Sequence, residues 1–455
     1  MKLDRIDDAI GERVERLVVA HHRRRLRRQG WRHAYDPPAD GLWCAGDPPP
    51  RDGNRFELLI DGDRALARLL EDIDGARESV FLAGWHFQPD FELARGGPTL
   101  REVLAEKAKH VDVRVLAWAG APLPLFTPSR GRVRTEREQL VRGTRIRMAL
   151  DDRERPMHCH HEKLALVDGH VAYVGGIDLT ALAGDRLDSH EHPARAGIGW
   201  HDASSRLEGP IVDDVAAHLG LRWREVTGET LDPVANEPQG DVRLQFVRTV
   251  PNGVYDALPR GDFRILEAYV RALRSAERLV YLESQFLWSP ELVRILVEKL
   301  RNPPSDEFHV VVLLPARANN GQDNTRGQLG ILVDNDRHER LLACTLYQEN
   351  RANPVYVHAK IGIVDDRWLA IGSANLNEHS LFNDTETCVI SCDENLARET
   401  RLALWREHLD VDEPTFDTWR ERAKDRAYDR VALLPHVSRR TRAFLGPLDS
   451  LLVDA

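Results

Sequence analysis

The sequence contains no apolar run that approaches the roughly 20 residues needed to span a bilayer. Its start, MKLDRIDDAIGERVERL, also lacks the apolar core of a signal peptide. It has only five cysteines, an odd number without CxxC spacing, which favours free thiols in a reducing compartment. We therefore expect a cytoplasmic protein, and peripheral attachment to the inner membrane surface stays open.

The chain also has no excess of positive charge, since 63 Lys and Arg face 73 Asp and Glu, for a net charge of −10. Nucleic-acid affinity depends on positive charge, so we expect no nucleic-acid partner, although a locally basic cleft remains compatible with this balance. The 455 residues are 42% apolar and 30% charged, which is typical of a globular protein with room for about two cores.

What the sequence does contain is a duplicated pattern of a histidine, a lysine two residues later and an aspartate five residues after the lysine. The copies are His161, Lys163 and Asp168, and His358, Lys360 and Asp365. The second copy begins 197 residues after the first. Each is followed by apolar residues and a small-residue pair, at 175–176 and at 372–373. This duplication suggests one active site built from two halves.

Helical and apolar strand patterns alternate around both copies of the pattern. A helical segment at 65–76 precedes a strand at 79–87, and 265–276 precedes 279–288 in the same way. Such alternation favours α/β units with buried, largely parallel strands. We expect two fused α/β sandwich halves related by a pseudo-twofold axis, each with a mainly parallel mixed sheet flanked by helices.

Irregular segments divide the chain. Residues 3–30 have helical spacing and end in a basic run that is either a solvated helix end or an anchor for anionic lipid. Residues 36–53 are rich in Pro and Gly, and the polar segment 228–241 is expected to link the halves. The expected parts are the N-terminal helix and connector (1–54), the first half (55–235), the second half (236–435) and the C-terminal tail (436–455).

In each copy of the pattern, an imidazole and an ammonium group are expected on the same face of a strand. Alternate residues of a strand point the same way, so His161 lies beside Lys163, and His358 beside Lys360. Two such pairs facing each other would supply a nucleophile, an acid and two cations around one phosphate. Phosphoryl chemistry requires charge stabilisation and positioning above all, which makes this reaction class the expected one.

The two patterns and the segments after them resemble the phospholipase D superfamily over roughly residues 55 to 435. Further segments resemble its phospholipid-cleaving branch, namely 200–202 with 207–210, 281–286, 375–380 and 384–386. Two positions depart from that branch, because Ser284 stands where Asn is usual and His379 where Arg is usual. These departures concern substrate contacts rather than the two patterns.

The resemblance implies a role for each residue of the patterns. His161 is then the nucleophile and His358 the general acid and base, although the residues alone leave open which histidine does which. Lys163 and Lys360 bind the phosphate oxygens. Asp168 and Asp365 complete the group of candidate catalytic residues by supporting the loops after the motif strands.

The resemblance and local chemistry also nominate supporting residues. Ser373, Asn375 and Gln285 are candidates for substrate binding. Asp188 and Glu386 follow their histidines by 27 and 28 residues and are candidates to orient the imidazoles, since a carboxylate usually holds a catalytic histidine. Glu283 either lines the site or is a buried structural acid.

We expect no cofactor and no metal. The run His158, Cys159, His160 and His161 is an alternative metal cluster. Strand alternation would, however, send His158 and His160 to the face opposite His161. The superfamily that the chain resembles needs no catalytic metal as a rule.

The segment 119–128 is strongly apolar for a loop. Its Leu123, Leu125 and Phe126 either enter a lipid surface, line a groove for an acyl chain or pack against the neighbouring half.

The resemblance implies a monomeric enzyme that hydrolyses or transphosphatidylates glycerophospholipids at a membrane surface. The reaction would pass through a phosphohistidine and release head group and phosphatidic acid. Three alternatives stay open, which are a cardiolipin-synthase-like phosphatidyltransferase, a superfamily nuclease and a lipid-surface binding module that retains the residues.

Overall fold

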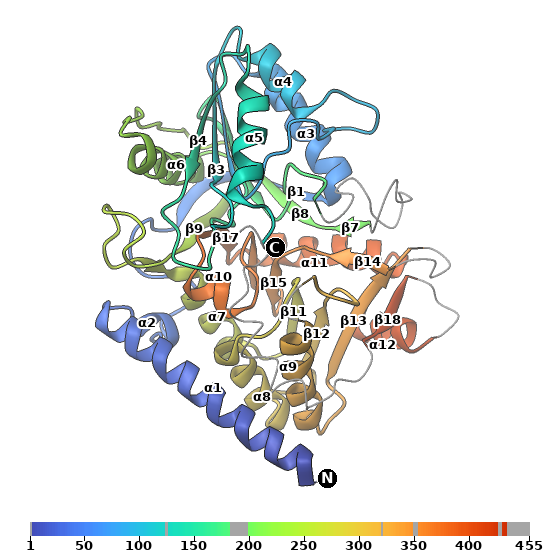
Figure 1. Cartoon of the computed structure of the whole chain (residues 1–455). Coiled ribbons are helices and arrows are strands. Elements are labelled where there is room, and N and C mark those ends of the chain that lie inside the picture. The colour runs from blue at the N-terminus through green and yellow to red at the C-terminus, as the bar shows by residue number, and fades with distance from the viewer. Residues whose placement is uncertain are drawn as a thin grey trace.

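The computed structural model describes residues 2–122, 126–182, 199–319, 322–348, 354–425 and 430–434. Strands of four to ten residues form two large sheets (Figure 1). The first sheet contains β1 (Arg51–Ile60), β2 (Ser79–Gly84), β3 (Asp112–Trp118), β4 (Arg147–Asp151), β5 (Leu164–Val167), β6 (Val171–Gly175) and β8 (Ala203–Glu208). The second contains β9 (Val242–Val250), β11 (Leu279–Glu283), β12 (His309–Leu313), β13 (Leu341–Tyr347), β15 (Ile361–Val364), β16 (Trp368–Gly372) and β17 (Glu386–Ser391).

Both sheets have the same strand order. The first runs β4-β3-β2-β5-β6-β8-β1, and the second runs β13-β12-β11-β15-β16-β17-β9. In each, the first three strands are parallel to one another and the later neighbours are antiparallel, so β4, β3, β2, β6 and β1 share one direction. The predicted α/β class with mixed sheets is confirmed.

Two strand pairings join the two sheets, and further short strands extend the second sheet. At their edges, β1 pairs with β9 through Arg51 and Leu244. β7 (Trp200–His201) pairs in parallel with β14 (Pro354–Val357), which itself pairs with β13. β10 (Asp262–Phe263) and β18 (Val431–Leu433) extend the second sheet. The link expected at 228–241 contains neither helix nor strand.

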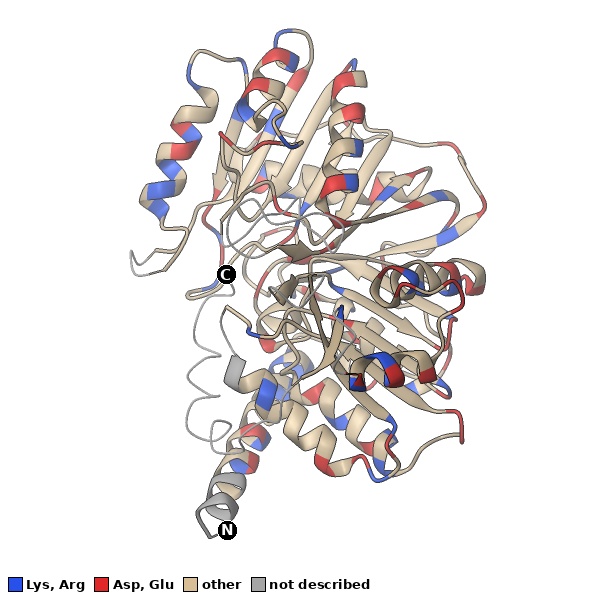
Figure 2. Ribbon diagram, turned by 90° about the vertical axis from the view of Figure 1, so that its right-hand side faces the viewer, with Lys and Arg blue, Asp and Glu red and all other residues tan. Residues whose placement is uncertain are grey.

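Helices flank the sheets. In the first half they are α3 (Asp61–Gly75), α4 (Leu100–Lys107), α5 (Arg130–Val141) and α6 (Ile211–Thr227). In the second they are α7 (Arg264–Ser275), α8 (Pro290–Arg301), α9 (Gln322–Asn335), α10 (Glu378–Phe382), α11 (Glu394–Leu409) and α12 (Phe416–Lys424). Spacing sets the buried faces, as in α3, where Leu66, Leu69 and Ile73 are buried. Acidic and basic side chains are interspersed along the helices (Figure 2).

The hydrophobic core crosses the boundary between the halves. Leu166 and Val174 of the first sheet share one cluster with Phe246 and Val389 of the second. A second cluster joins Ile60 to the strands β15 and β16. Burial of apolar surface therefore stabilises the pairing of the halves as well as each half by itself.

The N-terminal helix α1 (Lys2–Arg28) is followed by the short α2 (Arg32–Tyr35) and lies along the second half (Figure 1). Its basic end is partly engaged, because Arg25 donates to Asn383 Oδ1 at 2.8 Å and to Phe382 O at 3.0 Å. The next residue, Leu26, is fully buried in the core of the second half. This end of the helix is thus anchored on protein. Binding of its other arginines to anionic lipid stays a prediction.

The apolar loop at 119–128 is only partly within the described residues, which exclude Leu123 and Leu125. Phe126 packs against a cluster that contains Trp85, Trp118 and Cys159. No helix in the part of the chain that the structure describes combines the length and the apolar character of a transmembrane span.

Candidate active site

The structure brings the two histidines of the duplicated pattern together. The ring centroids of His161 and His358 are 6.5 Å apart and the rings are inclined by 70°. Each histidine lies three residues before a central strand, β5 or β15, so the equivalent ends of two equivalent strands meet. Their exposed fractions are 4% and 3%, which places both imidazoles in a largely water-excluded site.

Each imidazole is held by a carboxylate from the opposite half. Glu386 Oε1 lies 3.0 Å from His161 Nδ1, and Asp202 Oδ2 lies 2.6 Å from His358 Nδ1. Because Nδ1 of each ring binds a carboxylate, Nε2 is the nitrogen through which each ring would attack, accept or donate a proton. This crossing corrects the expected pairing of Glu386 with the histidine of its own half.

The other expected orienting residue, Asp188, lies outside the described residues. The carboxylate at His358 is Asp202, which belongs to the segment 200–202 that resembles the phospholipid-cleaving branch. No spacing rule pointed to Asp202, since it follows His161 by 41 residues and serves the histidine of the other half.

The two lysines are buried close to the histidines but have different surroundings. Lys163 Nζ donates to His161 O at 2.6 Å and lies 3.5 Å from Asp178 Oδ2. Lys360 Nζ donates to His358 O, and the residue that corresponds to Asp178 is the neutral Asn375. Burial lowers the pKa of Lys360 to about 7, against a partial opposing effect of the Asp202 carboxylate, and the charge of Lys163 lowers it further.

The Ser373 hydroxyl is bound to Glu386. It donates to Glu386 Oε2, and Ser380 Oγ donates to Glu386 Oε1 at 2.6 Å. The Glu386 carboxylate therefore binds two hydroxyls and one imidazole. Ser373 was expected to bind substrate, but these contacts make it a residue that positions Glu386.

Asn375 and Gln285 form a buried hydrogen-bonded row with an aromatic neighbour. Asn375 Nδ2 donates to Gln285 Oε1 at 3.3 Å, and Gln285 Nε2 donates to Tyr356 OH at 2.8 Å. The Trp200 ring lies 4.8 Å from Tyr356 and 4.3 Å from His358, centroid to centroid. Sequence reasoning missed this aromatic pair at His358, because no pattern distinguishes it from ordinary core aromatics.

The aspartates of the pattern lie at the other ends of the motif strands. Asp168 accepts hydrogen bonds from three successive backbone N–H groups, those of residues 77–79. Asp365 does the same for residues 277–279. Both have positive φ, 51° and 55°, which Asp tolerates better than most residues. They support the turns as expected, and grouping them with the catalytic residues is corrected.

Glu283 is a buried structural acid behind the site, the second of its two expected roles. It accepts from His201 Nε2 at 2.7 Å and from His408 Nε2 at 3.2 Å, and all three side chains are fully buried. Burial alone would lower the pKa of His201, but Glu283 and Asp61 raise it well above its usual value. The backbone oxygen of His201 accepts from His358 N at 2.7 Å, so this charged group supports the histidine.

Three comparisons with known proteins agree with this architecture. A family model described as cardiolipin synthase, PLD-like domain, matches residues 269–406. Phospholipase D A of Dictyostelium discoideum is 25% identical over 465 residues, covering 79% of this chain and 36% of that protein. Phospholipase D alpha 1 of Carica papaya is 24% identical over 523 residues, covering 78% of this chain and 64% of that protein. The chain thus spans less than two thirds of the length of either relative.

Among solved structures, phosphatidylserine synthase of Haemophilus influenzae Rd KW20 is similar with a TM-score of 0.51 at 13% identity. The likeness covers 78% of this chain and 86% of that one, and it shows a shared fold. Together with the duplicated pattern, the family model and the sequence relatives support the phospholipase D superfamily for this chain.

Proposed function

We propose that the protein is a phosphodiesterase that acts on glycerophospholipids through a covalent phosphohistidine and transfers the phosphatidyl group to water or to an alcohol. The observation that carries this proposal is the pair of buried histidines, whose rings face each other and whose Nδ1 atoms are each bound to a carboxylate of the other half. Two lysines beside them supply positive charge for a phosphate.

In the first step, His161 Nε2 attacks phosphorus and the bond from phosphorus to the head-group oxygen breaks. His358 gives its Nε2 proton to that oxygen, so the head group leaves as an alcohol. The Glu386 carboxylate raises the electron density of the attacking ring and stabilises its positive charge, as Asp202 does for the protonated His358. The ammonium groups of Lys163 and Lys360 stabilise the charge on the phosphoryl oxygens.

In the second step, His358 Nε2 accepts a proton from a water molecule or an alcohol, whose oxygen attacks phosphorus. The bond from phosphorus to His161 Nε2 breaks and the free imidazole returns. Water gives phosphatidic acid, and an alcohol gives a new phosphodiester. The low exposure of both histidines favours an acceptor that enters with the substrate over bulk water.

The test uses the full chain and phospholipid vesicles with labelled head groups, with products identified by mass. His161→Ala and His358→Ala should each lower the release of head group by at least about 10⁴-fold, since each removes a participant in bond making. His170→Ala changes an exposed histidine of the first half and serves as the matched control. Full activity in either pattern variant would exclude the mechanism.

The second candidate is a phosphatidyltransferase that joins two phospholipids. It is favoured by the description of the family model that matches the second half, cardiolipin synthase. The two reactions share the first step and differ in the acceptor. Phosphatidylglycerol vesicles distinguish them, because a transferase would yield cardiolipin and free glycerol, whereas hydrolysis would yield phosphatidic acid.

A further inference from the structure

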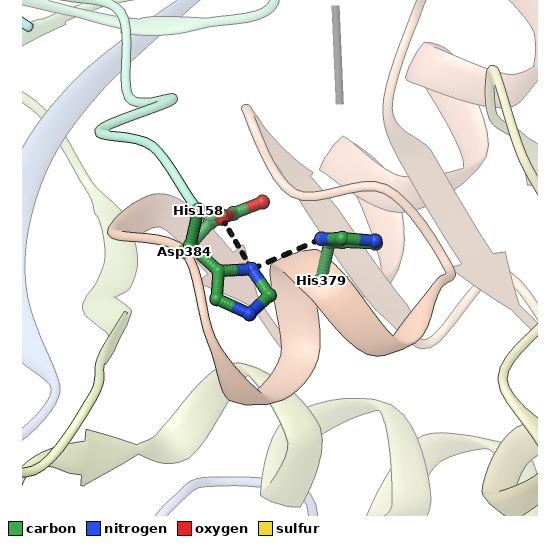
Figure 3. Close-up of side chains that lie close together, drawn as sticks. All are labelled: His158, His379 and Asp384. Atoms are coloured by element: carbon green, nitrogen blue, oxygen red, sulfur yellow. Dashed lines mark hydrogen bonds and ion pairs between the residues drawn. The ribbon is translucent and has the colours of Figure 1, made fainter. Parts of the chain in front are cut away.

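A second cluster of polar side chains lies near His161 and His358 and includes neither of them. His158 Nδ1 is 3.0 Å from His379 Nδ1 and 3.3 Å from Asp384 Oδ1 (Figure 3). His158 lies in the first half, three residues before His161, while His379 and Asp384 lie in the second half, in and just after α10. One atom from each side chain thus converges on one point at the boundary between the halves.

The chemistry of this cluster is that of a metal site. Two imidazole nitrogens and one carboxylate oxygen lie within 4.8 Å of one another. Zn²⁺ bound tetrahedrally at about 2.0–2.1 Å holds its nitrogen ligands about 3.3 Å apart, close to the separations found here. His379 and Asp384 are 1% and 0% exposed, whereas His158 is partly exposed, which leaves a side through which an ion and a water ligand can enter.

The cluster contains buried polar atoms whose partners among the described residues are incomplete. Two Nδ1 atoms at 3.0 Å cannot both carry a proton, so one imidazole must accept from the other. In the part of the chain that the structure describes, His379 Nε2 and Asp384 Oδ2 are buried and have no hydrogen-bond partner. Buried polar atoms of this kind are rare and costly, and a bound cation would compensate for the burial of the Asp384 carboxylate, although not for His379 Nε2.

Two other groups of potential ligands differ from this one. His201 has both ring nitrogens bound to carboxylates, those of Asp61 and Glu283, and it is fully buried. His22 binds Glu291 at 3.1 Å and stacks on Phe382, so it anchors α1. His201 therefore has both ring nitrogens engaged by carboxylates, and His22 is engaged by Glu291.

We infer that His158, His379 and Asp384 form a binding site for a single divalent transition-metal ion of the Zn²⁺ class, which fastens the two halves together next to the catalytic histidine. A mixed imidazole and carboxylate set suits Zn²⁺ better than Mg²⁺ or Ca²⁺, which prefer oxygen ligands alone. The ion is structural, and no step of the proposed reaction passes through it.

The position of the cluster explains how it would reach the active site. Residues 158–161 and 384–386 run side by side, with Thr385 N donating to Cys159 O at 3.1 Å and His161 N donating to Thr385 O at 2.9 Å. Asp384 Oδ1 also accepts from Cys159 N at 2.9 Å. One end of this ladder is the metal cluster, and the other end is the pair formed by His161 and Glu386.

The experiment measures Zn²⁺ itself. The full chain is stripped with a chelator, titrated with Zn²⁺ by calorimetry and analysed for bound metal after dialysis, and Co²⁺ replaces Zn²⁺ for absorption spectroscopy. The unchanged protein should retain one Zn²⁺ that His158→Gln and His379→Arg each fail to retain, with affinity reduced by about 100-fold or more. Its melting temperature should rise with Zn²⁺, whereas that of the variants should not.

Two control variants distinguish loss of the metal site from loss of folding. His170→Ala, an exposed histidine outside the cluster, should bind Zn²⁺ as the unchanged protein does. The arginine variant places a fixed cation beside Asp384 and should remain folded if the glutamine variant does not. Failure of the unchanged protein to bind Zn²⁺, or equal binding by the variants, would overturn the inference. These readouts are independent of phospholipid turnover, so they do not depend on the proposed function.

Discussion

The two catalytic histidines occupy equivalent positions in equivalent sheets, yet their surroundings differ. At Ser373 in the second half, a hydroxyl helps to hold the longer Glu386 against His161. The corresponding residue of the first half is Gly176, where an added Cβ would lie 2.2 Å from Asp202 Oδ1. The shorter Asp202 therefore occupies the space that a side chain fills in the other half.

A second difference concerns the lysines. Lys163 has the Asp178 carboxylate at 3.5 Å, whereas Lys360 has the neutral Asn375 at the corresponding position. The two halves thus carry similar sets of groups, and single differences in sequence give their lysines unlike neighbours. The histidine of one half can therefore act as nucleophile and that of the other half as acid, although the strands that carry the two histidines are equivalent.

Apart from replacement of the histidines, the largest loss of turnover is expected when either orienting carboxylate, Glu386 or Asp202, is replaced by an amide. A substrate whose leaving group needs no proton then distinguishes the roles of the two carboxylates. Glu386→Gln and Asp202→Asn should each lower turnover by about 10²- to 10⁴-fold, because an amide no longer fixes the imidazole as a carboxylate does. If His358 protonates the leaving group, activity of Asp202→Asn should recover on a nitrophenyl phosphodiester, whose leaving group needs no proton. Recovery in Glu386→Gln instead would reverse the two roles. Asp256→Asn, with an aspartate side chain 94% exposed, is the control.

A smaller loss of turnover is expected when positions 176 and 373, which correspond in the two halves, are given more similar side chains. Gly176→Ala should displace Asp202, whose other oxygen binds His358, and reduce turnover by about 100-fold. The reciprocal change, Ser373→Gly, removes one of two hydroxyls on Glu386 and should cost less. Kinetics on both variants, with circular dichroism to verify folding, test this order, and equal losses would refute the steric argument.

The pKa of Lys360, about 7, predicts a pH dependence of anion binding. Its charged form predominates below pH 7, so sulfate, which does not titrate there, should bind more weakly as pH rises through 7. Asn375→Asp gives Lys360 the carboxylate that Lys163 has and should move this transition upward by about one pH unit. Calorimetric titrations between pH 6 and 9 measure it, and an unmoved transition would contradict the assignment to Lys360.

The smallest effect concerns the aspartates that end the patterns. Asp365→Asn and Asp168→Asn each disturb hydrogen bonds to three backbone N–H groups and should lower the free energy of unfolding by about 1–3 kcal/mol. The loss should be larger for Asp365, which is 3% exposed, than for the half-buried Asp168. Urea denaturation measures both, and turnover per folded molecule should change little in either.

The fold was largely predictable because local patterns determine it. Apolar runs at strand length, helices between them and a constant offset of 197 residues indicated two similar α/β halves. Both histidines and lysines were found in the same way. The orienting pairs were not, because Asp202 and Glu386 reach across the boundary, and no spacing within a half encodes a contact between halves.

Ser373 and Glu283 show the same limit at a smaller scale. Both are the right residue types for a site, and only their contacts reveal that one positions Glu386 and the other lies in a buried charged group. His379 carried a usable signal, since it departs from the arginine of the resembling branch. Strand alternation predicts that its partner His158 points away from His161, so only the three-dimensional contacts reveal the cluster.

The crossed carboxylates also bear on redundancy. A duplicated gene segment normally provides a spare, so that damage to one copy leaves the other working. Here each copy lends a carboxylate to the histidine of the other, and a lesion in one half therefore disables chemistry in both. A half expressed alone would hold a histidine without its carboxylate, and only re-pairing with the other half, on one chain or two, would restore either.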